Sequence, residues 1–599
     1  MSRSGSCQTS TLWLARSAAV LVAVLMLLSL GGCPTGGNNG GNNGGNNGGN
    51  NGGNNGGNNG GGGGGGGGGA IEDLFPDGTG GGSGGGGSGG GGSGGGTDDG
   101  GDDVGGDDEI PVPTALSRQR IVQTGTAVPE QPAGTTFTEF GSPIIDDDGR
   151  VAFWAYYEGP TALGNGGLYV WEDGTIVRIT DDNPNLTGQL PGGTSTGRFG
   201  DYAPLPNYDP LKEPLAWGDA GRLMFVSTMT GDSGERGMFR WRASDRNLLR
   251  VADTTSIAEA LEVSAADTFF VFANHGVSDL GIVMFRVRFT SLSPLMSGSA
   301  IVTSAVTTDG IVVTPVVPMA TSSSAYITTG AVPDQGTTAY FADFLEYTTL
   351  SPSGYLLFQG GYAGGTGSHG IYLRTSPGVV SRVIDDRPTL SLPGLPTGAR
   401  YGIEGEYYNA MAIGKNGHIA IETPITVGSE TDDAVILWDW SEVEWTELTA
   451  GDGTTYATNL VSGVSDGGAV LVLAGGTPHI VDRTSGVSIA ASMSGDFTGV
   501  ALTWDDAGGA INNFGRAVVP YTRTAGDTPG LGFWTNQRLV VIVDPAANIP
   551  VADITAIKAD SRPETNRPGR SGILNDADEV AFHVTFSDGK EAIYVGRAR

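Results

Sequence analysis

A short turn followed by an apolar strand recurs along residues 118–599, and this repeat constrains the fold more than any other feature. One copy reads Asp-Asp-Asp-Gly-Arg-Val-Ala-Phe and ends at Phe153. The slot after the turn recurs about every 60 residues, a period typical of repeat architectures. It is occupied by Gly149, Gly221, Gly281, Gly354, Gly417, Gly468, Gly515 and Asp578. The pattern predicts one supersecondary unit used eight times.

Each repeat is expected to contain about four strands. Glycine or aspartate in the turn slot indicates a positive φ, and the apolar run after it predicts a strand buried on both faces. A second apolar strand follows, as in 167–171, and then a more polar third strand, as in 175–180. An aromatic segment precedes several turns, as in 135–140. Four strands per unit are typical of a β-propeller blade.

The two ends of the repeat region complement each other. Residues 118–124 resemble the third strand of a repeat, without the first two strands before it. The eighth repeat, by contrast, stops after its second strand. We expect 120–124 to pair antiparallel with 593–596, which closes a ring and removes exposed sheet edges. The predicted fold of residues 115–599 is therefore an all-β, eight-bladed β-propeller, with seven blades as the alternative. Eight is preferred because the turn signature is counted eight times.

The first 32 residues have the features of an export signal. Arg3 and Arg16 precede an apolar run at 18–28, which is shorter than the roughly 20 residues of a membrane span. Leu30-Gly31-Gly32-Cys33 follows, and this sequence resembles the lipobox of bacterial lipoproteins. The resemblance implies removal of residues 1–32, a diacylglycerol on Cys33, and an extracytoplasmic protein anchored to the inner or the outer membrane. A plain secretory signal with a chance cysteine is the alternative.

Residues 33–114 combine Cys33 with a Gly-, Asn-, Ser- and Asp-rich linker, whose composition predicts a disordered tether. Cys33 would be the sole cysteine after cleavage, which leaves no disulfide. The formal net charge of −32 argues against a nucleic-acid partner. We expect a monomer whose partners are the membrane, through Cys33, and an unknown protein or glycan.

The repeat resembles the bacterial tandem-repeat proteins named for the motif Asn-x-x-Gly-x-x-Ala-Phe. Asn512 and Asn575 keep the Asn, and Ala152-Phe153 and Ala581-Phe582 keep the final pair, whereas Asp578 replaces the Gly. The resemblance implies a repeat fold and export, with no assigned activity and no catalytic residues.

Acidic residues follow several of the predicted third strands, and no catalytic residue stands out beside them. Corresponding positions of a ring share one rim, so these carboxylates could gather there and attract a cation such as calcium or a basic partner. The alternative, which we favour, is that they start turns. The residues concerned are Asp181, Asp182, Asp253, Asp385, Asp386 and Asp544. The histidines are scattered and show no zinc-site spacing.

Aromatic residues offer a second lead, in Trp154, Tyr156 and Tyr157 and in Tyr401, Tyr407 and Tyr408. They are expected either to stack on a ligand ring or, more often, to pack between blades. The favoured function is a lipid-anchored binding scaffold without enzymatic activity. The alternative is a polymer-degrading hydrolase or lyase with its site in the axial channel.

Overall fold

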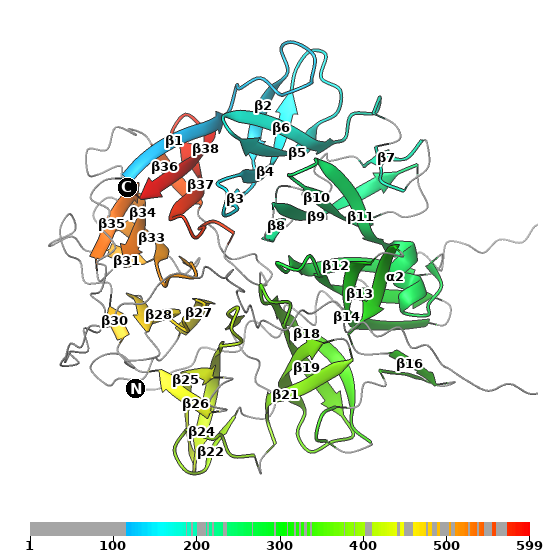
Figure 1. Cartoon of the computed structure of the whole chain (residues 1–599), viewed down its shortest axis with the longest axis vertical. Coiled ribbons are helices and arrows are strands. Elements are labelled where there is room, and N and C mark those ends of the chain that lie inside the picture. The colour runs from blue at the N-terminus through cyan, green and yellow to red at the C-terminus, as the bar shows by residue number, and fades with distance from the viewer. Residues whose placement is uncertain are drawn as a thin grey trace, which may run out of the picture. The chain divides into compact units, whose positions relative to one another are not determined.

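The computed structural model describes residues 116–598 apart from internal gaps, the longest being 201–210, 402–409, 449–458, 491–501, 544–553 and 559–571. The predicted export signal at 1–32, Cys33, the predicted linker up to residue 114 and Asp544 lie outside the described residues. Within the described part, eight four- or five-stranded sheets are arranged as an eight-bladed β-propeller (Figure 1). The eight-bladed prediction is confirmed, and the seven-bladed alternative is wrong.

Blades 1 to 4 follow one another along the chain. Blade 1 contains β2 (Thr136–Phe140), β3 (Ile144–Ile145), β4 (Val151–Glu158), β5 (Gly166–Glu172) and β6 (Thr175–Asp181), and blade 2 contains β7 (Arg198–Phe199), β8 (Leu215–Gly218), β9 (Arg222–Thr230), β10 (Arg236–Arg242) and β11 (Asn247–Asp253). Blade 3 contains β12 (Thr268–Val277), β13 (Val283–Leu292), β14 (Leu295–Thr307) and β15 (Gly310–Pro315). Blade 4 contains β18 (Tyr340–Leu350), β19 (Leu356–Ala363), β20 (His369–Ser376) and β21 (Val379–Asp385).

Blades 5 to 8 complete the ring. Blade 5 contains β22 (Ala399–Tyr401), β23 (Ala410–Ile413), β24 (Ile419–Val427), β25 (Glu430–Asp439) and β26 (Glu444–Leu448), and blade 6 contains β27 (Asn459–Val464), β28 (Val470–Ala474), β29 (Thr477–Val481) and β30 (Ser488–Ala490). Blade 7 contains β31 (Leu502–Trp504), β32 (Ala510–Ile511), β33 (Ala517–Arg523), β34 (Thr528–Thr535) and β35 (Arg538–Val543). Blade 8 contains β36 (Ile554–Lys558), β37 (Glu579–Phe586), β38 (Glu591–Ala598) and β1 (Leu116–Gln123).

Helix α2 (Thr254–Ala260) and the hairpin of β16 (Met319–Ser322) and β17 (Ala325–Thr328) are additions to the blades. None of the helical segments that the structure describes has the length and apolar character needed to cross a membrane.

The strand after each turn is the buried centre of its blade. Seven of the eight residues of β4 are buried or half-buried, and the outer strand β6 is half-exposed along most of its length. The turn residues adopt positive φ in all eight repeats, from +62° at Asp578 to +86° at Gly354. The predicted turn and the polarity of the central and outer strands are thus confirmed.

Buried apolar side chains fill every junction between blades. The described residues form eight apolar clusters, and each cluster joins one pair of neighbouring blades. The junction of blades 8 and 1, for example, includes Val122, Phe153 and Ile593. Because each blade buries both faces against its neighbours, no single blade has a complete core of its own.

The ring is closed by pairing of the two ends of the described chain. Strands β1 and β38 run antiparallel, with Arg120 opposite Tyr594 and Val122 opposite Ile593. The predicted closure is confirmed, and the pairing extends further than expected, from Leu116 to Gln123 on the N-terminal strand.

The repeat turns also contact one another around one end of the ring. Asn575 Nδ2 donates to the carbonyl of Asp146 (2.8 Å), and Asn513 Nδ2 donates to Asp576 Oδ2 (2.7 Å). Such turn-to-turn bonds supplement the apolar junctions, because a short side-chain amide or carboxylate satisfies backbone groups that a turn leaves open.

Candidate functional site

The aspartate pair of blade 1 lies where β6 ends. Asp181 Oδ2 accepts hydrogen bonds from Arg178 Nη1 (2.8 Å) and Gln131 Nε2 (3.1 Å). Asp182 Oδ1 accepts the backbone N–H of Asn165 (2.7 Å), in the loop between β4 and β5. Both carboxylates are buried. They hold the end of the third strand against two neighbouring segments.

The aspartate pair of blade 4 has the same surroundings. Asp385 Oδ2 accepts Gln335 Nε2 (3.1 Å), and Asp386 Oδ1 accepts the backbone N–H of Ser368 (2.8 Å). Gln335 Nε2 also donates to Tyr362 Oη (2.8 Å). Blade 1 has the matching bond from Gln131 Nε2 to Tyr157 Oη (3.0 Å).

The glutamines belong to a segment that precedes the first strand of each of these two blades. It reads Ala-Val-Pro-Glu-Gln at 127–131 and Ala-Val-Pro-Asp-Gln at 331–335. The acid of each segment contacts the arginine of its blade, Glu130 with Arg178 (2.5 Å) and Asp334 with Arg382 (3.5 Å). Two blades that are distant in sequence therefore carry one duplicated polar network.

The two carboxyls of the blade 4 pair differ in acidity. Burial raises the pKa of Asp385 to about 6, against the attraction of Arg382. Burial acts in the same direction on Asp386, but hydrogen bonds from His369 and Ser368 outweigh it and lower the pKa of Asp386 to about 2. Separated pKa values are common in acid–base sites. Here both carboxyls are adjacent in one blade and bound by its own side chains, which is typical of a structural network.

The other predicted rim residues are placed differently. Asp253 is the N-cap of α2, and its side chain accepts the backbone N–H of Ser256 (2.8 Å), whereas Asp544 lies outside the described residues. Among the described side chains, no group of three or more His, Cys, Asp or Glu is arranged to hold a metal ion. A cation at this rim stays a prediction.

The aromatic candidates are packed between blades wherever they are described. Trp154 contacts the ring of Phe225 (6.0 Å between centroids) in the junction of blades 1 and 2. Tyr157 belongs to the junction of blades 8 and 1, and Tyr401 to that of blades 4 and 5. Tyr407 and Tyr408 lie outside the described residues.

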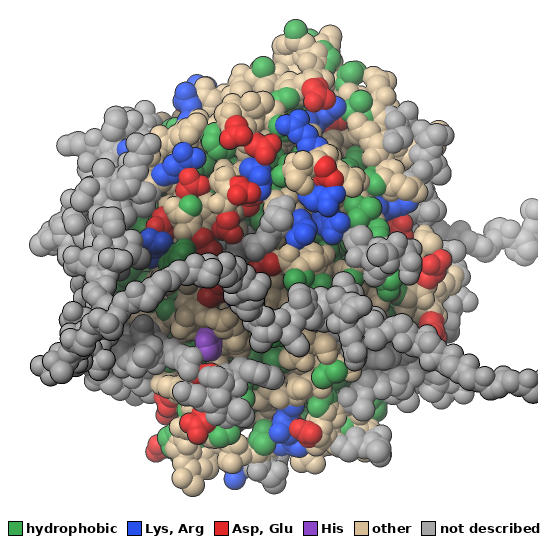
Figure 2. Space-filling model, in the orientation of Figure 1, with side chains coloured by type: hydrophobic (Ala, Val, Ile, Leu, Met, Phe, Trp, Pro, Cys, Tyr) green, Lys and Arg blue, Asp and Glu red, His purple; other side chains and the backbone are tan. Residues whose placement is uncertain are grey.

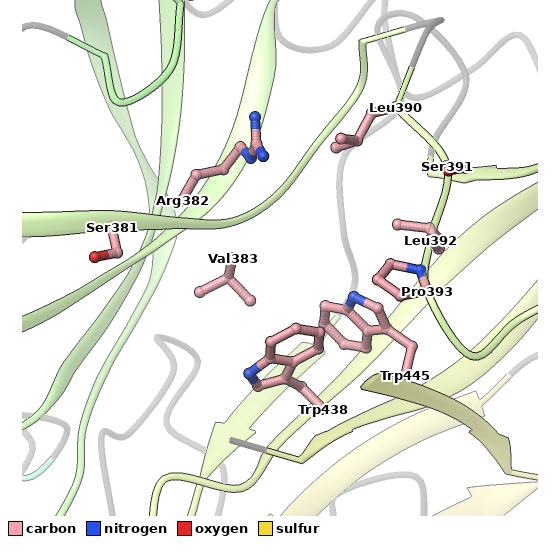
Figure 3. A pocket seen from close by; sticks show the side chains of 9 residues that line it. All are labelled: Ser381, Arg382, Val383, Leu390, Ser391, Leu392, Pro393, Trp438 and Trp445. Atoms are coloured by element: carbon pink, nitrogen blue, oxygen red, sulfur yellow. The ribbon is translucent and has the colours of Figure 1, made fainter. Parts of the chain in front are cut away.

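A pocket of about 500 Å³ opens between the outer part of blade 4 and blade 5 (Figure 3). This volume lies within the range of roughly 300–1,000 Å³ typical of small-molecule sites. Its lining residues are Ser381, Arg382 and Val383 of β21; Leu390, Ser391, Leu392 and Pro393 of the connection to blade 5; and Trp438 and Trp445 of β25 and β26.

Two tryptophans form one wall of this pocket. Trp438 and Trp445 are cross-strand partners, and their rings lie 5.0 Å apart at 50°. The backbone N–H of Trp445 donates to the carbonyl of Pro393 (2.9 Å), which fixes the opposite loop. The indole N–H of Trp438 is buried without a hydrogen-bond partner in the described part of the chain. A buried donor left in this state costs about 1–3 kcal/mol.

This pocket was not predicted from the sequence. Its tryptophans lie in Trp-Asp-Trp-Ser-Glu-Val-Glu-Trp at 438–445, where three of eight residues are tryptophan. That density was a usable signal, because tryptophan is rare and is enriched at binding surfaces. The opposite wall of the pocket comes from blade 4, and no local sequence pattern indicates that blade 4 lies against these tryptophans.

Comparisons with known proteins add little about function. Residues 113–291 match the model of a family of unknown function (DUF7453), which spans the closing strand, blades 1 and 2 and part of blade 3. No match was found among curated proteins.

Solved structures resemble the chain weakly. The WD40 domain of SCAP from fission yeast is 8% identical over 81% of this chain and 98% of its own, with a TM-score of 0.32. YCF48 from Cyanidioschyzon merolae is 10% identical over 67% of this chain and 98% of its own, with a TM-score of 0.28. The Hadza microbial sialidase Hz136 is 10% identical over 59% of this chain, with a TM-score of 0.25, and the chain spans 64% of its length.

Proposed function

We propose that the protein is a lipid-anchored, extracytoplasmic binding scaffold whose ligand enters the pocket between blades 4 and 5. The observation that carries this proposal is the pair of indole rings that line this pocket. A rigid propeller is suited to this role, because pockets between packed blades are held open without the ligand. The buried aspartate pairs, by contrast, are occupied in holding their own blades together.

The chemistry of the pocket favours a sugar ring. The apolar face of a pyranose stacks on an indole, as aromatic side chains pack on any apolar ring face. Its hydroxyl groups would exchange hydrogen bonds with Ser381 and Ser391, which also line the pocket. Arg382 supplies a positive charge at the rim, although Asp334 and Asp385 lie 3.5 and 3.8 Å away and reduce its net effect.

The test is glycan binding by the full chain, produced with Cys33→Ala so that it stays soluble. We expect at least one glycan of a surface-polysaccharide panel to bind saturably, and Trp438→Ala to weaken that binding tenfold or more, about 1.4 kcal/mol. Phe514→Ala is the matched control, because Phe514 is an exposed aromatic residue of the blade 7 turn (63% exposed). Equal affinity of the Trp438→Ala variant and the parent would place the ligand elsewhere.

The anchor has a separate test. The chain with Cys33 intact should label with radioactive fatty acid and sediment with the membrane fraction, and Cys33→Ala should abolish both. Labelling that persists in the variant would contradict the lipobox interpretation.

A further inference from the structure

Arg374 is a buried arginine whose charge no described residue neutralises. It lies near the end of β20, opposite Leu356 of β19 and Val380 of β21, and it is 6% exposed. Its Nε is buried without a hydrogen-bond partner, and none of the described residues forms an ion pair or a hydrogen bond with its guanidinium. Burial lowers the pKa of this group, and no charge from the described part of the chain opposes that effect.

The repeat places a tryptophan at this position in four other blades. Trp171 lies two residues after Tyr169, and Arg374 lies two residues after Tyr372. Each of these tyrosines pairs with the phenylalanine that ends the repeat motif of its blade. Trp171 is as buried as Arg374, at 6% exposed. The same register places tryptophan in blades 2, 5 and 7, as Trp241, Trp438 and Trp534. Blade 4 therefore has a guanidinium where a large apolar ring is usual.

Other arginines of the two duplicated blades reach an acid. Arg178 of blade 1 contacts Glu130, and Arg382 of blade 4 contacts Asp334 (3.5 Å). Figure 2 shows the same mixture on the visible surface, where Lys and Arg side chains lie among Asp and Glu side chains. Arg374 is an exception to this pairing in a chain whose formal net charge is −32.

The junction between blades 3 and 4 is apolar on the side from which a counter-ion could come. Its buried cluster includes Met284 of blade 3, whose cross-strand partner is Thr303. The Thr303 hydroxyl donates to a backbone carbonyl of β15 (3.3 Å). Asp343, an acid of the inner strand β18, accepts the hydroxyl of Ser299. These described groups offer Arg374 no carboxylate.

A buried charge without a partner strongly destabilises the folded state, whereas a tryptophan at the same position has no such effect. The cost disappears when the missing charge comes from a ligand. A guanidinium suits this role, because its parallel N–H donors match two oxygens of a carboxylate, phosphate or sulfate group.

We propose that Arg374 anchors an oxyanion site between blades 3 and 4, which takes the carboxylate, phosphate or sulfate group of a ligand or the free ion. The site lies in a different junction from the tryptophan pocket, so it does not depend on the proposed glycan binding. The bound anion supplies the counter-charge that the described residues do not supply.

The experiment measures binding of radiolabelled sulfate and phosphate to the full chain with Cys33→Ala, by equilibrium dialysis in sodium chloride of fixed ionic strength. We expect saturable binding of one anion per chain, with formate as a competitor if the site accepts a carboxylate. Thermal unfolding should rise with the same anions, because a ligand of the native state stabilises it by mass action. Glycerol phosphate and phosphatidylglycerol vesicles distinguish a soluble ester from a lipid headgroup.

Arg374→Met is the decisive variant, and Arg246→Gln is its control, because Arg246 is an arginine with a 63% exposed side chain. Arg374→Met should bind the anion at least tenfold more weakly than the parent, and Arg246→Gln should bind it equally well. In chloride without the anion, Arg374→Met should melt at a higher temperature than the parent, since an unpaired buried charge is removed. Arg374→Trp, which copies blade 1, is a second variant with the same expected loss of binding.

Three results would overturn the proposal. The first is no saturable binding of sulfate, phosphate or formate by the parent. The second is equal binding by the parent and the Arg374→Met variant. The third is a lower melting temperature of Arg374→Met and Arg374→Trp in chloride, which would mean that the guanidinium stabilises the protein without any ligand. General salting-out by sulfate and phosphate raises the midpoints of parent and variants alike, so the comparison between them excludes it.

Discussion

A disulfide across the closing strands tests whether the pairing of β1 and β38 limits the stability of the ring. Ser117 lies opposite Arg597 in that pairing, and the region from residue 115 onward has no native cysteine. We consider Ser117→Cys with Arg597→Cys in a background where Cys7 and Cys33 are alanine. Oxidation would then link strands that belong to the two ends of the propeller.

The expected gain follows from the length of chain that the link encloses. The chain-entropy relation gives about 6 kcal/mol for a loop of about 480 residues, and measured disulfides seldom exceed about 5 kcal/mol. The Arg597 substitution costs part of this, because Arg597 Nε lies 2.6 Å from Glu579 Oε1. We therefore expect the free energy of unfolding of the oxidised protein to exceed that of the reduced protein by about 2–5 kcal/mol.

The assay is urea unfolding of the same double variant with and without reductant, and the single Arg597→Cys variant controls for the lost ion pair. An increase in the unfolding midpoint that disappears on reduction supports the closure argument. Failure of the two thiols to oxidise would mean that the strands are not neighbours in solution. Complete oxidation without any rise in the midpoint would mean that the ring first opens at another junction.

Three further predictions concern the polar networks. The pKa of Asp385 in the folded protein, about 6, lies above the ordinary aspartate value of 3.8, so its contribution to stability is complete below pH 3.8 and is lost as the pH rises through 6. Asp385→Asn should remove this pH dependence, which amounts to up to about 3 kcal/mol. The measurement is the unfolding free energy of the variant and of the parent at pH 4 and at pH 7. Gln335→Leu should cost about 1–3 kcal/mol in urea unfolding, because Asp385 and the tyrosine beside it lose a buried donor; a neutral effect would contradict the network. Asp578→Gly relieves a positive φ but removes the ion pair with Arg516, so we expect a lower melting midpoint, and a rise would show that backbone strain dominates.

Much of the fold could be predicted because the repeat imposes it. Every blade has a turn position that requires a positive φ, followed by a run of apolar residues. The eight copies could therefore be counted in the sequence, and the order of the strands within each copy could be inferred. The closing pair could be predicted from what each end lacks. The number of blades and the closing pair depend on a pattern that is local to each repeat, so the sequence alone is enough to predict them.

The details of the candidate sites could not be predicted in the same way. The aspartate pairs were visible as acids after third strands, but their partners Gln131 and Gln335 come from a segment about 50 residues earlier in the chain. The wall opposite Trp438 belongs to another blade. Each of these contacts arises from packing between segments that no periodic pattern connects.

The closing strand has a consequence for the order in which the protein is made. Synthesis proceeds from the N-terminus, so β1 leaves the ribosome long before β38, its hydrogen-bonding partner, exists. Until the eight residues of β38 are made, blade 8 is missing a strand and the edge of β1 lacks its hydrogen-bonding partner. The ring can therefore close only after β38 has been made, and a chain from which β38 is deleted would leave the ring open.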